Sequence, residues 1–202
     1  MNSRTELPMV RSRRLILRHA GPVDIHRMAA EYLWTLVENQ PGDPDRKVSE
    51  VWVWEIAPGL SMHYFHDFVT GQEGVVFFGD GPGEVNRFAL LARARLDLWE
   101  DQDLLDSVDL DGDRDSAMTS LFRLGLGAPL AQDPQFLAVI QAAMTHHDPL
   151  IRRGGVWAAG FAAWPGLVEA LRELAERDPD GQVRADADQA RSAIESSQGR
   201  AR

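Results

Sequence analysis

Residues 148–178, DPLIRRGGVWAAGFAAWPGLVEALRELAERD, set the architecture of the second half of this chain. The stretch opens with Asp148-Pro149, passes through Ile151-Arg152 and a run of small residues, and restarts at Pro165 with leucine and valine at helical spacing. Proline is tolerated in the first turn of a helix, because the N–H that it lacks has no intrahelical partner there. We therefore expect two helices joined by a short turn.

The same pattern occurs again after this stretch and, more weakly, before it. Asp178-Pro179 opens a second copy in which Val183-Arg184 follows at a similar distance, and a weaker copy covers residues 116–127 and 134–144. A single helix pair of this size has too little core of its own and buries its apolar side by stacking on its neighbours. The pattern predicts a short array of stacked helical hairpins.

This arrangement resembles the HEAT-like helical repeat over about residues 115–195, whereas the N-terminal half resembles no family that we recognise. Gly154 and Gly155 stand where that family usually has alanine, and glycine costs about 1 kcal/mol of helix propensity at each position. The resemblance implies a stack of helices that offers a surface to a binding partner.

The first half of the chain predicts a small antiparallel sheet with helices. Three segments of strand-like composition are separated by glycine-rich turns, and residues 85–99 favour a helix over a fourth strand because leucine, alanine and arginine favour helix. We expect an α+β fold over residues 1–108, followed by the HEAT-like array over residues 109–202. The three strands are expected at residues 51–56, 61–68 and 74–78.

Trp34 is the first candidate contact residue. Apolar residues from Ile25 to Val37 recur at helical spacing after Pro22-Val23-Asp24, which predicts one amphipathic helix capped by Asp24. At 100° per residue, Trp34 lies roughly 150° from the centre of this apolar stripe, on the polar face. We expect it either to dock against the second half of the chain or to anchor a partner, since tryptophan is enriched in binding hot spots.

Charge provides the other candidate site. The formal net charge is −10, and nine of the nineteen residues from Asp97 to Asp115 are acidic. Such a chain disfavours nucleic acid, whose binding depends on cationic contacts to phosphate, and favours a basic protein partner. With Trp34, the predicted partner-binding residues are the aspartates of this segment: Asp101, Asp103, Asp106, Asp109, Asp111 and Asp113.

No catalytic, cofactor or metal site is predicted. The chain has no cysteine, which excludes thiol chemistry and thiolate metal sites. Residues 109–115 resemble the start of a calcium loop, but Arg114 replaces the turn glycine and Ser120 replaces the bidentate glutamate. We expect a helix cap at Asp115 instead. No apolar run is long enough to span a membrane and no signal peptide is expected. The absence of cysteine makes a reducing cytoplasm the expected location.

The leading hypothesis is a non-enzymatic protein-binding module, one version being an inhibitor or immunity protein that neutralises a basic toxin. The excess of arginine over lysine is typical of a GC-rich genome and suggests a bacterial source. Two alternatives stay open. One is a small-molecule site between the sheet and the repeats. The other is a HEAT-like DNA-repair glycosylase using Trp157 and Trp164, which the negative charge disfavours.

Overall fold

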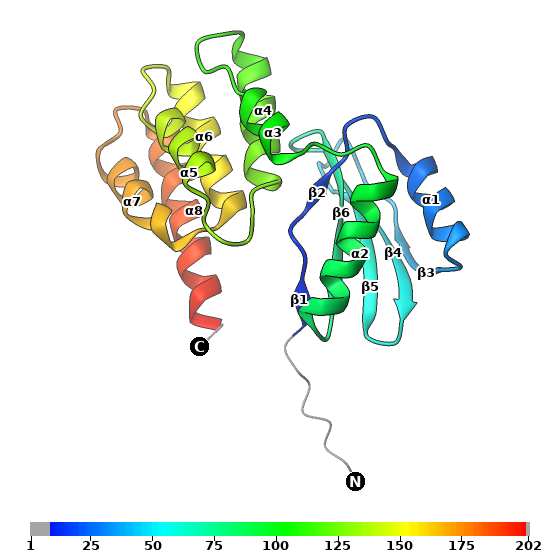
Figure 1. The fold of residues 1–202 in the computed structure, drawn as a ribbon. Coiled ribbons are helices and arrows are strands. Elements are labelled where there is room, and N and C mark those ends of the chain that lie inside the picture. The colour runs from blue at the N-terminus through cyan, green and yellow to red at the C-terminus, as the bar shows by residue number, and fades with distance from the viewer. Residues whose placement is uncertain (1–8, 201–202) are drawn as a thin grey trace. The chain divides into compact units, whose positions relative to one another are not determined.

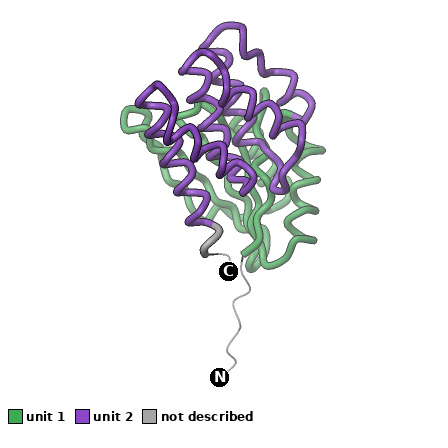
Figure 2. Tube along the Cα trace, turned by 90° about the vertical axis from the view of Figure 1, so that its left-hand side faces the viewer, with its two compact units in different colours: residues 1–99 green, residues 100–202 purple. Residues whose placement is uncertain are grey.

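The computed structural model describes residues 9–200 of the chain (Figure 1). It divides into two compact units, residues 1–99 and residues 100–202 (Figure 2). This division falls ahead of the boundary expected after residue 108. Regular structure in the first unit comprises strands and helices, and every regular element described after Trp99 is helical.

The N-terminal unit contains one antiparallel sheet whose strands run in the order β1-β6-β5-β4-β3, with β2 also paired to β6. The three strands expected from the sequence are confirmed as β4, β5 and β6, each within three residues of the predicted ends. The strands are β1 (Val10–Arg11), β2 (Leu15–Ile16), β3 (Thr35–Gln40), β4 (Glu50–Ala57), β5 (Leu60–Asp67) and β6 (Gln72–Gly79).

Two helices, α1 (Pro22–Glu31) and α2 (Pro82–Arg95), pack on the same face of the sheet. The helix favoured over a strand for residues 85–99 is confirmed as far as Arg95, whereas Leu98 forms an isolated antiparallel bridge with Leu17. Side chains that alternate along the strands meet the helices in one core, as period-two patterning requires. This core contains Ile25, Met28, Trp54, Met62, Tyr64, Phe77 and Val85.

The expectation of one helix continuing to Val37 is wrong, because α1 ends at Glu31 and residues 35–40 form the edge strand β3. Leu33 adopts a left-handed conformation with φ of 58°. Its N–H donates to Ala30 O, and the Trp34 N–H donates to Ala29 O. This is the Schellman arrangement that ends helices, although glycine usually occupies the left-handed position. Helical spacing of apolar residues does not reveal such an end.

Six helices and one turn of 3-10 helix make up the described part of the C-terminal unit, as the repeat predicts. α6 packs against α4 on one side and α8 on the other, while α5 packs on α6 and α7 packs on α8. The elements are α3 (Asp101–Asp106), α4 (Arg114–Leu126), α5 (Pro134–Met144), α6 (Pro149–Ala162), η1 (Pro165–Leu167), α7 (Val168–Arg177) and α8 (Gly181–Arg200).

Close helix packing explains a glycine that the sequence alone marks as unfavourable. A Cβ atom at Gly155 would lie 2.7 Å from the Met144 backbone nitrogen and 3.0 Å from the Ala143 carbonyl carbon. These contacts are too short for any side chain. Gly155 therefore lowers the helix propensity of α6, but the absence of a side chain allows α6 to pack closely on α5.

A buried ion pair links successive repeats. Arg152 donates from Nε and Nη2 to the two carboxylate oxygens of Asp178, at 2.7 and 2.8 Å, and from Nη1 to the carbonyls of His146 and His147. Burial opposes the charge of Asp178, yet the Arg152 hydrogen bonds lower the pKa of its carboxyl overall. The Asp-Pro and Ile-Arg signature therefore connects α6 to the segment that precedes α8.

Candidate functional site

The six predicted aspartates follow one another along the start of the C-terminal unit. Asp101, Asp103 and Asp106 lie on α3, while Asp109 and Asp111 lie in the connection to α4. Asp113 is the N-cap of α4, so the cap expected at Asp115 is two residues too late. All except the half-buried Asp103 are exposed.

Several of these carboxylates also stabilise local backbone structure. The carboxylate of Asp103 accepts from the Glu100 N–H at 3.3 Å, and that of Asp109 accepts from the Asp111 N–H at 3.2 Å. Asp113 accepts from the backbone N–H and hydroxyl of Ser116, and these hydrogen bonds lower the pKa of its carboxyl. Asp113 is therefore ionised at neutral pH.

The acidic connection is anchored rather than freely solvated. Val108 and Leu110 pack against a buried cluster of Ala117, Leu121, Ala143 and Ile151, while the intervening Asp109 and the following Asp111 are exposed. Alternation between apolar and acidic residues thus fixes the segment to α4, α5 and α6 and presents its carboxylates to solvent. Their role in partner binding remains a prediction.

Trp34 does not lie on a polar helical face. It follows the end of α1 and is half-buried within the N-terminal unit. Its ring packs on Tyr32 at 5.7 Å and meets Phe77 and Phe88 edge-on at 6.4 and 5.7 Å between ring centroids. Trp34 thus contributes to the core of its own unit, and its predicted contact with a partner stays a prediction.

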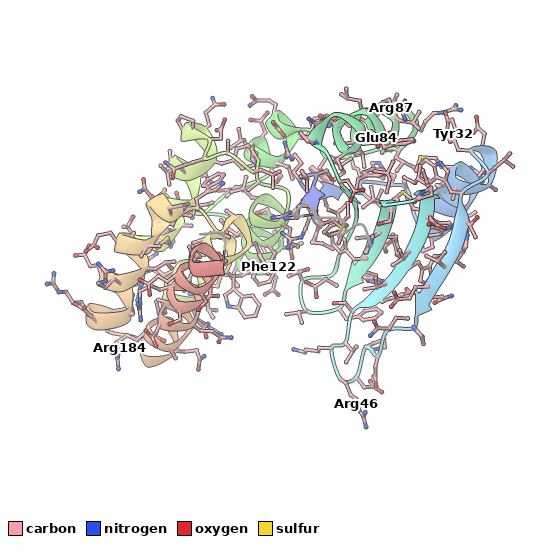
Figure 3. The ribbon with its side chains drawn as sticks, turned by 90° about the horizontal axis from the view of Figure 1, so that it is seen from below. Tyr32, Arg46, Glu84, Arg87, Phe122 and Arg184 are labelled. Atoms are coloured by element: carbon pink, nitrogen blue, oxygen red, sulfur yellow. The ribbon has the colours of Figure 1, made fainter. Side chains whose placement is uncertain are left out.

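Three aromatic rings gather where α4 and α6 pack together, on a site that the sequence analysis missed. The centroid of the Phe122 ring lies 5.6 Å from that of Trp157 and 6.3 Å from that of Phe161, and the last two are 5.9 Å apart. All three side chains are only partly buried. In Figure 3 the Phe122 side chain projects from α4.

A groove of about 210 Å³ lies next to these rings, between α6 and α8. Trp157 and Phe161 line it from α6, and Asp186 and Gln189 line it from α8. It remains open because the other lining residues include Gly160, Ala190 and Ala193, which are too small to fill it. We call this site the aromatic groove.

Asp186, which lines the aromatic groove, forms an ion pair with Arg153. The Asp186 carboxylate accepts from Arg153 Nε at 2.9 Å, from Trp157 Nε1 at 3.3 Å and from Gln182 Nε2 at 2.8 Å. Burial opposes ionisation, but these hydrogen bonds outweigh it and lower the pKa of Asp186. Asp186 on α8 therefore joins the Trp157 indole and Arg153 of α6 through hydrogen bonds at the edge of the groove.

Comparison with known proteins identifies the helical part of the chain. A family model described as HEAT repeats matches residues 102–191. This segment is a HEAT-repeat region. No curated protein and no solved structure matches the chain. HEAT repeats are generally protein-interaction modules, so the comparison agrees with a non-enzymatic binding role.

Within the HEAT-repeat region, the aromatic groove has the chemistry of a contact surface. An apolar wall, a floor of small residues and an ion pair at one side can hold an apolar side chain of another molecule. Among residues 9–200, no group of three or more histidine, aspartate and glutamate side chains is placed to hold a metal ion. No helix in the described range has the length and apolarity needed to cross a membrane.

One sequence signal for the aromatic groove was available. Trp157 and Phe161 are four residues apart and so share one side of α6, while Ile151, Ala158 and Ala159 are buried on another. Trp164, which the glycosylase alternative paired with Trp157, is 2% exposed and donates from Nε1 to the Pro129 carbonyl. Of the two tryptophans, Trp157 alone lines the groove.

Proposed function

We propose that this protein is a non-enzymatic binding module that holds a basic protein partner on the HEAT-repeat region. The aromatic groove carries this proposal. It is an apolar recess on the surface, walled by Trp157 and Phe161 and bordered by Asp186. Binding hot spots in protein interfaces are enriched in tryptophan and arginine, and both occur here as Trp157 and Arg153.

Charge supports the choice of a basic partner. Residues 100–202 contain 18 acidic and 10 basic side chains, and five of the six predicted aspartates are exposed. Excess negative charge accelerates the encounter with a cationic partner and repels nucleic acid. In this proposal the acidic segment steers the partner and the groove anchors it.

The most specific form of the proposal is a cytoplasmic inhibitor or immunity protein that neutralises a basic toxin or nuclease. A glycosylase role has less support, because Trp164 is buried and the charge is unfavourable for DNA.

Filling the aromatic groove tests the proposal. Ala193→Leu places a larger side chain at an exposed position that lines the groove, and Ala185→Leu makes the same change on α8 outside it. We expect wild type and Ala185→Leu to capture the same basic protein from lysate of the source cell, and Ala193→Leu to lose at least 90% of it.

Salt separates the two contributions. Capture is expected to weaken between 50 and 500 mM salt, because salt screens the electrostatic attraction between the acidic segment and a basic partner. Equal capture by Ala193→Leu would contradict the groove as the contact site. A captured partner that is neither basic nor salt-sensitive would contradict the electrostatic part.

A further inference from the structure

We propose that the aromatic groove binds an extended segment of the partner chain, with a single apolar anchor between basic residues, and not an amphipathic helix. This inference rests on the proposed function and adds the conformation and chemistry of the bound segment.

The length of the apolar wall limits the number of anchors. Trp157 and Phe161 are four residues apart, which corresponds to about 6 Å along the helix axis. A helix that docks in a groove usually presents anchors at positions i, i+3 or i+4, and i+7, and needs a longer apolar surface. Arg153 and Asp186 make the groove polar one turn before Trp157. One apolar side chain fits between the aromatic wall and the small residues Gly160 and Ala190.

Polar groups beside the groove match an exposed backbone. Within residues 9–200, Arg153 uses only Nε, toward Asp186, so the donors on its two terminal nitrogens have no protein acceptor. Its side chain is 30% exposed. Gln189 lines the groove, and its amide makes no hydrogen bond in the described part of the chain. A glutamine amide both donates and accepts, and arginine only donates.

The backbone of an extended peptide can pair with these groups at any residue, whereas the backbone of a helix can do so only at its ends. The backbone N–H and C=O groups of a helix are paired internally except at its ends. An extended segment offers free N–H and C=O groups at each residue, which can pair with Gln189 and with the terminal nitrogens of Arg153. The net negative charge of residues 100–202 favours basic residues on either side of the anchor through long-range attraction.

A phage-displayed library of random 12-residue peptides tests the inference. It is selected on the full-length wild-type protein and, in parallel, on Ala193→Leu and Ala185→Leu. We expect wild type and Ala185→Leu to enrich peptides with one aliphatic or aromatic residue between lysines and arginines, and Ala193→Leu to lose them.

Backbone modification of an enriched peptide provides the second measurement. N-methylation next to the anchor is expected to weaken binding by about fivefold, the effect of losing one hydrogen bond, and Gln189→Ala to weaken it similarly. Enriched peptides with i, i+4, i+7 apolar spacing that bind better when stapled as helices would overturn the extended conformation and leave docking in the groove intact. Equal enrichment on Ala193→Leu, or none on wild type, would overturn the proposed function as well.

Discussion

Arg152 and Arg184 occupy equivalent places in successive repeats, yet only one of them is buried. In each arginine, Nη1 donates to the backbone carbonyls of the residues six and five positions earlier in the chain. Arg152 also donates to both carboxylate oxygens of Asp178. The exposed Arg184 (Figure 3) makes no hydrogen bond to a carboxylate among the described side chains. The repeat motif therefore gives both arginines the same hydrogen bonds to the backbone. Only Arg152 also binds a carboxylate at the start of the following repeat, so we expect it to contribute more to the stability of the fold.

Removing each guanidinium should separate the two positions most clearly. Arg152→Met leaves Asp178, which is 5% exposed, without its partner, and we expect a loss of about 3 kcal/mol in the free energy of unfolding. Arg184→Met changes an exposed side chain and should cost less than about 0.5 kcal/mol. Urea unfolding followed by far-ultraviolet circular dichroism measures both. Equal losses would show that the Asp178 pair has no special weight.

Acid should reduce the difference between these variants. The hydrogen bonds from Arg152 lower the pKa of Asp178 in the folded protein, so the stability that they provide is complete above the unfolded value of about 4. It is lost as pH falls through the lower folded value. We expect the stability gap between wild type and Arg152→Met to narrow below about pH 4. The gap to Arg184→Met should change much less, because the charge of Arg184 is a smaller cause of the lowered Asp178 pKa than the hydrogen bonds from Arg152. A pH-independent gap would contradict this ionic origin.

Two glycines of α6 provide the same contrast on a smaller scale. Gly155→Ala forces a Cβ to within 2.7 Å of the Met144 nitrogen, and should cost about 1–3 kcal/mol despite the better helix propensity of alanine. At Gly160 the nearest atom to a Cβ is the Ala190 Cβ, at an ordinary 3.5 Å. Gly160→Ala should stabilise the protein by up to about 1 kcal/mol. Thermal unfolding compares them, and a destabilising Gly160→Ala would count against the role of contact distance.

The smallest effect is expected in the N-terminal unit. Leu33 is 89% exposed and left-handed, a conformation that costs a side chain about 1 kcal/mol. Leu33→Gly should therefore stabilise the end of α1 by about 0.5–1 kcal/mol. A lower midpoint of urea unfolding in Leu33→Gly would instead assign a stabilising contact to the leucine side chain.

Sequence reasoning succeeded where a local signal defines the element. Asp148-Pro149 marks the start of α6, and alternation with intervening glycine turns marks β4, β5 and β6. It failed at Leu33, because a stripe of apolar residues continues past a helix end that depends on one dihedral angle.

The aromatic groove was missed for a different reason. Trp157 and Phe161 resemble core residues in the sequence, and their exposure depends on which side of α6 remains uncovered after α4, α5 and α8 have packed. Trp34 illustrates the reverse case. Its predicted place on a polar helical face suggested a contact with the second half of the chain or with a partner. In the structure Phe77 and Phe88, more than forty residues later, partly bury it. Tertiary neighbours decide both outcomes.

Amide hydrogen exchange on the full chain, with and without the basic protein that it captures, tests the central claim most directly. Our account predicts that the partner slows exchange over residues 153–161 of α6 and 182–193 of α8, because these segments border the aromatic groove. Unchanged exchange in both segments, with protection confined to residues 9–99, would contradict it.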